Sequence, residues 1–127
     1  MGDPRTVLIV EDDVDLRSMF KTALTLAGYT VREAGDGYDA LQSIDAHPPD
    51  LVILDLMLPT LSGAAVQQEI AAQVITRDIP VMIVTGSAQP VDERAVACVL
   101  RKPVSPSLLV DAVRKCLGNG RARGAHH

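Results

Sequence analysis

The chain has 127 residues, 47% of them hydrophobic, and a formal net charge of −4 at pH 7. This length is typical of one domain with a substantial core, and the acidic balance argues against nucleic acid as a direct ligand. The longest apolar runs have about four residues, against the ~20 that a membrane span needs, and no signal segment opens the chain. We therefore expect a cytoplasmic globular domain.

Five short, mostly continuous apolar runs predict β-strands. They are Thr6–Val10, Thr30–Glu33, Leu51–Leu54, Pro80–Val84 and Ala97–Leu100. Continuous rather than alternating apolar character is typical of a parallel sheet that is covered on both faces. The second run is more polar than the others, which favours a position at the edge of the sheet.

Helical periodicity fills the segments between these strands. The first pattern runs from Leu16 to Ala27 and stops at Gly28, and the last begins with Ser105 as its cap and ends at Gly118. Two shorter patterns are marked by Asp36 as a cap and by Val66, Ile70 and Val74. Strands that alternate with helices predict a doubly wound α/β sandwich, in which right-handed crossovers place helices on both faces of the sheet.

We expect one domain over residues 1–118 and a flexible tail over 119–127. The tail is basic and Gly-rich, and its last two histidines look like the remnant of a purification tag. Cys98 and Cys116 lie in apolar patterns, so free thiols in a reducing cytosol are favoured over a disulfide.

Polar residues follow four of the five strands, and they are the main functional signal of the chain. Because parallel strands end at one edge of a sheet, these side chains are expected to meet there. They are Glu11, Asp12 and Asp13, then Asp55, then Thr85, and finally Arg101 and Lys102. Clustered carboxylates need a cation, most simply Mg²⁺, and a carboxylate kept ionised beside a metal and a lysine can attack phosphorus.

Four motifs carry a resemblance to a known family. They are VLIVEDD at 7–13, DLMLPTLSG at 55–63, VMIVTG at 81–86 and LRKPV at 100–104. In this order and strand context the chain resembles the receiver domain of two-component response regulators. The resemblance implies a flavodoxin-like sheet in the order 2-1-3-4-5. It also implies a signalling phosphoacceptor rather than a metabolic enzyme. A histidine kinase or a histidine phosphotransfer protein would phosphorylate this domain, which would assist its own phosphorylation and dephosphorylation.

By this resemblance, Asp55 aligns with the phosphorylated aspartate, which also contacts the metal. Glu11 and Asp12 align with the acidic pair that binds Mg²⁺, and the backbone carbonyl of Met57 with the group that completes the metal shell. Asp13 is expected to be a helix cap or to lie outside the ligand set. The alternative is that Asp55 only begins a turn and has no chemical role.

The resemblance also assigns the residues that respond to the phosphoryl group. Thr85 aligns with the switch hydroxyl and Lys102 with the lysine of the family, and Pro103 follows where the family often has a cis peptide bond. Ser87 either positions water or bonds only to the backbone, and Arg101 is expected to face solvent.

Two features depart from the family pattern. Val99 stands three residues before Lys102, where the family usually has a Tyr or Phe whose ring moves with the switch hydroxyl. The segment between Thr85 and Lys102 is short and contains Pro90, so the fourth helix is expected to be shortened or irregular. We therefore hypothesise that the signal is read through the order of loop 86–95.

Two rival functions remain open. An aspartyl-phosphate phosphatase of the haloacid dehalogenase type usually has a second aspartate two residues after its nucleophile, but Met57 occupies that position. A degenerate receiver would act only as a protein-docking module; the intact acidic, hydroxyl and lysine positions argue against it, and Val99 argues for it. We expect a stand-alone receiver or part of a longer regulator or hybrid kinase, with no direct nucleic-acid or membrane partner and an effector that the sequence does not identify.

Overall fold

A parallel sheet forms the centre of the molecule, which a computed structural model describes over residues 4–118. Its five strands run in the order β2-β1-β3-β4-β5, and every neighbouring pair is parallel. The strands are β1 (Thr6–Val10), β2 (Thr30–Ala34), β3 (Leu51–Leu54), β4 (Val81–Thr85) and β5 (Cys98–Arg101). The predicted strand order is therefore confirmed, including the edge position of the polar second strand.

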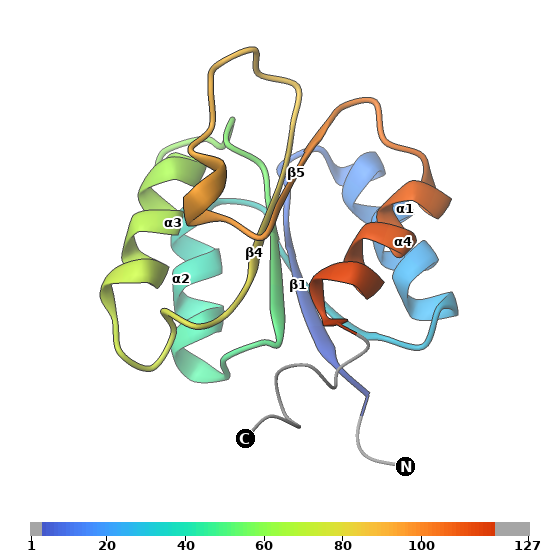
Figure 1. The fold of residues 1–127 in the computed structure, drawn as a ribbon, viewed down its shortest axis with the longest axis horizontal. Coiled ribbons are helices and arrows are strands. Elements are labelled where there is room, and N and C mark those ends of the chain that lie inside the picture. Colours follow the sequence, from blue (N-terminus) through green and yellow to red (C-terminus); the bar gives the residue numbers. More distant parts are fainter. Residues whose placement is uncertain (1–3, 119–127) are drawn as a thin grey trace.

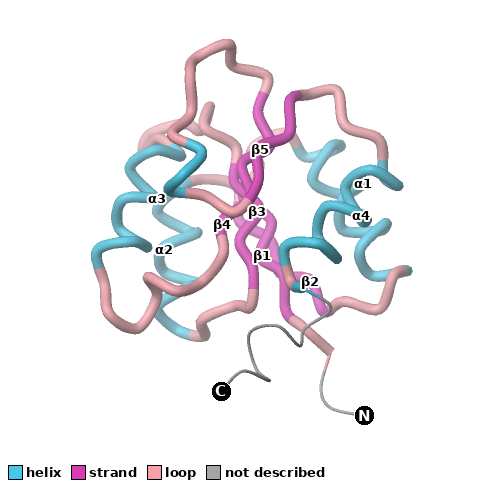
Figure 2. The backbone as a smooth tube through the Cα atoms, viewed as in Figure 1, coloured by secondary structure: helices cyan, strands magenta, loops and turns pink. Residues whose placement is uncertain are grey.

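Helices cover both faces of this sheet (Figures 1 and 2). One face carries α1 (Val14–Leu26) and α4 (Pro106–Cys116), and the other carries α2 (Gly37–Ala46) and α3 (Gly63–Ala72). This confirms the predicted doubly wound α/β architecture.

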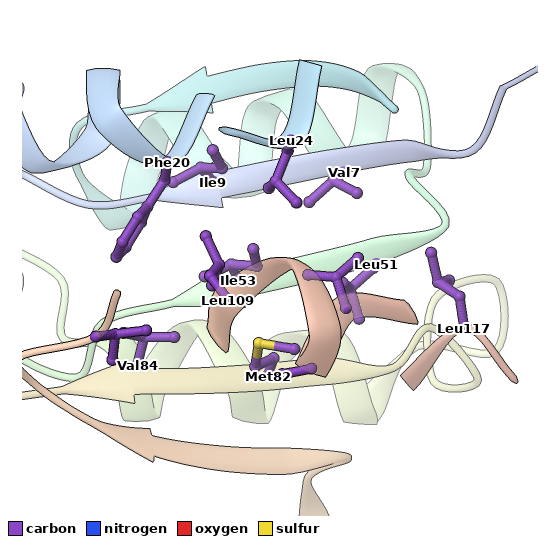
Figure 3. Packing of buried hydrophobic residues seen from close by; sticks show 13 residues of the cluster. Val7, Ile9, Phe20, Leu24, Leu51, Ile53, Met82, Val84, Leu109 and Leu117 are labelled. Carbon is purple, nitrogen blue, oxygen red and sulfur yellow. The ribbon is translucent and has the colours of Figure 1, made fainter. Parts of the chain in front are cut away.

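The core has two layers, one on each side of the sheet. On the side of α1 and α4, Ile9 of the sheet packs in a cluster with Phe20 and Leu109 of the helices (Figure 3). On the other side, Leu8 belongs to a cluster that includes Val66 of α3. Successive residues of a strand thus enter opposite layers, which explains why the strand sequences are continuously apolar.

Polar side chains at the helix starts accept hydrogen bonds from backbone N–H groups that have no partner within the helix. In α2, Oδ1 of Asp36 accepts from the Asp39 N–H at 2.8 Å. In α4, the Ser105 hydroxyl accepts from the Leu108 N–H at 3.2 Å. At the end of α1, Gly28 adopts a φ of 101°, a left-handed conformation that favours glycine. These cap and stop signals were predicted from the sequence.

The third helix is shorter than its apolar pattern predicted. It ends at Ala72, so the prediction that Val74 continues it was wrong, and Val74 is 74% exposed. The reason is a competing hydrogen bond: the buried Thr76 hydroxyl donates to the Ile70 carbonyl at 2.7 Å. This bond satisfies a carbonyl of the last turn and folds the chain back toward β4.

The connection between β4 and β5 contains only a three-residue 3₁₀ helix, η1 (Glu93–Ala95). It lies beside α3 (Figure 1), where the Gln67 side-chain amide donates to the Ala95 carbonyl at 3.1 Å. The prediction of a shortened fourth helix is therefore confirmed.

Three smaller expectations can be compared with this fold. Both cysteines are free, as predicted. Across residues 4–118, no helix has the length and apolar character that crossing a membrane requires. The expected tail over 119–127 lies outside the described residues.

An ion-pair group joins α1 to the edge strand β2. The Glu33 carboxylate accepts from Lys21 Nζ at 3.1 Å and from Arg17 Nε at 3.2 Å. The hydrogen bond from Lys21, followed by the one from Arg17, lowers the pKa of Glu33 below its ordinary value of 4.5. A lowered pKa means that the stabilisation is complete above pH 4.5 and is lost as the pH falls through the folded-state pKa.

We predict that Glu33→Gln lowers the free energy of unfolding at pH 7 by about 0.5–1 kcal/mol, the range for a partly exposed pair. The difference from the parent chain should shrink as the pH falls below 4.5, because protonation removes the same charge. Urea unfolding at pH 7 and at pH 3.5 measures both values, with the exposed Glu93→Gln as a matched control. A deficit that stays constant with pH would contradict this account.

Candidate functional site

The residues predicted to meet at one sheet edge do meet there. Glu11 follows β1, Asp55 follows β3, Thr85 ends β4, and Lys102 follows β5. Backbone hydrogen bonds continue the sheet through these positions: Asp55 N–H donates to the Val10 carbonyl at 3.1 Å, and Lys102 N–H donates to the Thr85 carbonyl at 2.9 Å. The parallel topology thus brings together side chains that are distant in the sequence.

Lys102 joins the two buried carboxylates of this edge. Its Nζ donates to Oε1 of Glu11 and to Oδ2 of Asp55, each at 2.7 Å. Glu11 is 2% exposed and Asp55 is 4% exposed, so neither carboxylate is well hydrated. Short, charge-assisted hydrogen bonds to one ammonium group therefore replace water around both anions.

Burial and hydrogen bonding shift the pKa values of Glu11 and Lys102 in opposite directions. Burial raises the pKa of Glu11, although the hydrogen bond from Lys102 opposes the shift. Burial alone would lower the pKa of Lys102, but its hydrogen bonds to Asp55 and Glu11 raise that pKa overall. The ammonium group is consequently protonated at neutral pH and supplies the positive charge that the carboxylates require.

An acidic cluster beside Lys102 could hold a metal ion. One carboxylate oxygen from each of Glu11, Asp12 and Asp55 lies within 4.8 Å of the others. Asp12 is exposed whereas the other two are buried, so the cluster opens to solvent on one side. Carboxylate oxygens are hard ligands that suit a divalent ion such as Mg²⁺, and the three residues fit such a site.

The neighbours of the acidic cluster have different roles. Asp13 caps α1: its Oδ1 accepts from the Leu16 N–H at 3.1 Å, as one of the sequence alternatives predicted. The Asp13 N–H donates to Oε2 of Glu11 at 3.0 Å, and the Met57 N–H donates to Oδ1 of Asp55 at 3.0 Å. The Met57 side chain is 62% exposed. The role of its carbonyl as a metal ligand stays a prediction.

Gly63 allows the chain to pass close behind Asp55. A Cβ atom at this position would collide with the Asp55 carbonyl oxygen, so the first residue of α3 has to be glycine. The Gly63 N–H donates to the Leu56 carbonyl at 3.2 Å and fixes the turn after Asp55. On the other side of the site, the Lys102–Pro103 peptide bond is cis, as the resemblance implied.

Thr85 connects the site to the loop that follows β4. Its hydroxyl is buried and accepts from the Ser87 N–H at 3.1 Å. The Ser87 hydroxyl accepts from the Gln89 N–H at 3.1 Å, so Ser87 bonds to the backbone, which was one of the two alternatives for it.

Two arginines contribute contacts that the sequence analysis missed. Arg101 is exposed, as expected, yet its guanidinium donates to the Ser87 carbonyl at 2.5 Å and to the Gln89 carbonyl at 3.3 Å. Arg17 of α1 donates to the Glu11 carbonyl at 2.7 Å and so fixes the loop that carries the acidic residues. The only sequence signal for Arg17 was its place one turn after the cap of α1.

We predict that Lys102→Met lowers the free energy of unfolding at pH 7 by about 3 kcal/mol, the lower end of the range for a broken buried ion pair, because two buried carboxylates lose their cation. Urea unfolding without divalent ions measures this loss. Lys115→Met, an exposed lysine of α4, should cost less than about 0.5 kcal/mol. Equal stability of the Lys102→Met variant and the parent would show that the ammonium is not needed to keep these carboxylates buried.

Comparisons with known proteins agree with this geometry. The response regulator receiver domain family matches residues 7–114. A probable transcriptional regulator ycf27 of Cyanidium caldarium is 36% identical over 94% of this chain and 49% of its own length. The polar-differentiation response regulator DivK of Brucella anthropi is 30% identical over 91% of this chain and 98% of its own length.

Solved structures give the same result. A putative response regulator from Chloroflexus aurantiacus superposes with a TM-score of 0.84 at 32% identity, over 91% of this chain and 99% of its own. The chemotaxis response regulator CheY4 of Vibrio cholerae gives 0.83 at 26% identity, over 90% and 99% of the two chains. The chain therefore belongs to the response regulator receiver domain family, the phosphoacceptor signalling domains of two-component systems.

Proposed function

We propose that Asp55 is the phosphoacceptor of this receiver domain and that a sensor histidine kinase or a histidine phosphotransfer protein is the donor. Receiver domains of response regulators interact with histidine kinases. The observation that carries the assignment is the hydrogen bond from the Lys102 ammonium to the buried Asp55 carboxylate at 2.7 Å. A carboxylate that faces a lysine ammonium is a competent nucleophile toward phosphorus.

In the proposed reaction an Asp55 oxygen attacks phosphorus while the phosphorus–nitrogen bond of the donor's phosphohistidine breaks. The electron pair of that bond returns to the imidazole of the donor. Asp55 keeps free lone pairs for this attack, because among residues 4–118 Oδ1 accepts a hydrogen bond only from the Met57 N–H and Oδ2 only from Lys102. Lys102 neutralises charge on the transferred group, and the Thr85 hydroxyl can donate its proton to a phosphoryl oxygen.

The proposed metal is Mg²⁺, held by Glu11, Asp12, Asp55 and the carbonyl of Met57. When bound, it would supply positive charge to the phosphoryl oxygens. Because Asp12 is exposed, the ion and the donor would approach the acidic cluster from the side of Asp12. We propose that the same groups assist slow hydrolysis of the phosphoaspartate. In that step water takes the place of Asp55 as the acceptor, and the phosphoryl group has the same charges to be neutralised.

The chain spans about half the length of several curated relatives that it matches and nearly all of another. We therefore propose residues 1–118 as a receiver that acts in the cytoplasm, alone or within a longer regulator. The effector that reads it is a protein rather than nucleic acid or a membrane, in keeping with the acidic chain.

We further propose that phosphorylation is read through loop 86–95. Val99 is partly buried and packs against the buried apolar cluster on the side of α2 and α3, and a valine has no ring that could move. The Thr85 hydroxyl instead holds the Ser87 N–H, and Arg101 holds the Ser87 and Gln89 carbonyls. If Thr85 turns toward a phosphoryl oxygen, Ser87 loses its acceptor and the loop loses one of these attachments.

We predict that acetyl phosphate with Mg²⁺ adds one phosphoryl group to the parent chain and none to Asp55→Asn. Intact-mass spectrometry measures the addition, and Asp45→Asn, an exposed carboxylate of α2, is the matched control that should react like the parent. Chelating the metal should abolish labelling. A parent chain that stays unlabelled would support the degenerate docking receiver instead, and turnover of a small phosphate ester would support the phosphatase.

We predict that beryllium fluoride with Mg²⁺, a phosphoryl mimic, speeds amide exchange at residues 87–89 at least about threefold, because the Ser87 N–H loses its acceptor. Arg101→Ala should speed the same amides without the mimic, whereas Arg94→Ala, which removes an exposed guanidinium from η1, should not. Hydrogen–deuterium exchange with peptide resolution gives the rates. Unchanged protection of this loop on addition of the mimic would exclude it as the reader of the signal.

A further inference from the structure

The two cysteines lie together in a groove between β5 and α4. Cys98 is the first residue of β5 and Cys116 is the last residue of α4. Both are half-buried, and Cys98 lies near enough to raise the pKa of the Cys116 thiol. The groove has a volume of about 420 Å³, and both cysteines line it together with Leu100, Leu108 and Lys115.

This pair is separate from the phosphoacceptor site. Cys98 begins β5, whereas Lys102 follows the last residue of the same strand, so the two sites lie at opposite ends of β5. The contacts of the site described above do not involve either thiol. The pair therefore has a chemistry that phosphoacceptor function does not account for.

We propose that Cys98 and Cys116 are a redox modification site that forms an intramolecular disulfide with a low-molecular-weight disulfide, such as oxidised glutathione, as the oxidant. The open groove gives such a molecule access to the thiols. Because both cysteines line the same groove of the folded chain, the second sulfur is nearby when the first has reacted, which favours ring closure over attack by a second molecule.

The order of attack follows from the surroundings of the thiols. Burial raises the pKa of Cys116 to about 11, and the proximity of Cys98 adds to this shift. Since the thiolate is the attacking species, Cys116 is a poor first nucleophile at neutral pH. Cys98 is therefore assigned the first attack and Cys116 the second, where its nearness to the mixed disulfide offsets its low thiolate fraction.

The atoms and electrons balance in two exchanges. The Cys98 sulfur attacks one sulfur of glutathione disulfide, that S–S bond breaks, and the first glutathione thiolate leaves. The Cys116 sulfur then attacks the Cys98 sulfur of the mixed disulfide and expels the second glutathione thiolate. The two protein thiols lose two electrons, glutathione disulfide gains them, and the two thiol protons end on the two glutathione thiolates.

The bond would connect the edge strand to the last helix. β5 has a strand neighbour on one side only, β4, and α4 packs against the sheet through Leu109 and Val113. A covalent link between residues 98 and 116 would restrict both elements and partly fill the groove between them. Oxidation would thus change the shape of this face without changing any charge at the phosphoacceptor site.

The test treats the reduced, folded chain with oxidised glutathione at pH 7.5. We expect loss of the mass of two hydrogen atoms, a cross-linked tryptic pair of peptides 95–101 and 116–121, and reversal by dithiothreitol. The melting temperature should rise by about 5 °C or more, because the link constrains the unfolded chain. Formation should be at least about tenfold faster than in urea, where the thiols are not held together.

Two matched variants test the assignment of each sulfur. Cys116→Ser should stop at a stable glutathione adduct on Cys98, and Cys98→Ser should react at least about tenfold more slowly than the parent. Circular dichroism checks that both variants are folded. A stable glutathione adduct on the parent chain, disulfide-linked dimers, or ring closure no faster in the folded chain than in urea would each overturn the proposal.

Discussion

One ammonium group between two buried carboxylates is the interaction on which the candidate site depends. Glu11 and Asp55 leave neighbouring strands at the same edge, and repulsion between two dehydrated anions would be large without a cation. Lys102 reaches both at 2.7 Å from β5, although β4 lies between β3 and β5 in the sheet. The pairing is thus less a source of net stability than a condition for burying two carboxylates at one edge of the sheet.

The parallel sheet meets this condition because it ends all its strands at one edge. The order β2-β1-β3-β4-β5 puts the strands that carry the acidic residues side by side at the centre. Around them, Arg17 fixes the loop after β1 through the Glu11 carbonyl, and Gly63 lets α3 begin directly against the Asp55 backbone. Both of these supports act on the main chain and take up no oxygen of the two carboxylates.

The sequence was informative wherever topology alone determines position. Residues at the carboxyl ends of parallel strands lie at the same edge of the sheet, so the sequence alone predicts that Asp55 and Lys102 lie close together. The end of α3 could not be predicted from the spacing of apolar residues, because that spacing does not reveal the hydrogen bond from the Thr76 hydroxyl to the Ile70 carbonyl. The same holds for Arg101, whose contacts are with the backbone of an irregular loop. It also holds for Cys98 and Cys116, which line one groove because α4 packs beside β5.

The short connection between β4 and β5 limits the ways in which phosphorylation of Asp55 could alter the structure of the rest of the domain. In place of a full helix it has η1 and an extended loop, and Val99 lies in the apolar layer behind them. The valine side chain is stiff because it is β-branched, and it has no polar atom that could make a hydrogen bond, so it can only fill space. The polar route from the site to this loop runs through Thr85 to the Ser87 N–H, with Arg101 attached to the same turn. A receiver built in this way would transmit the phosphoryl group's arrival as a change in main-chain hydrogen bonding rather than as the rotation of a ring.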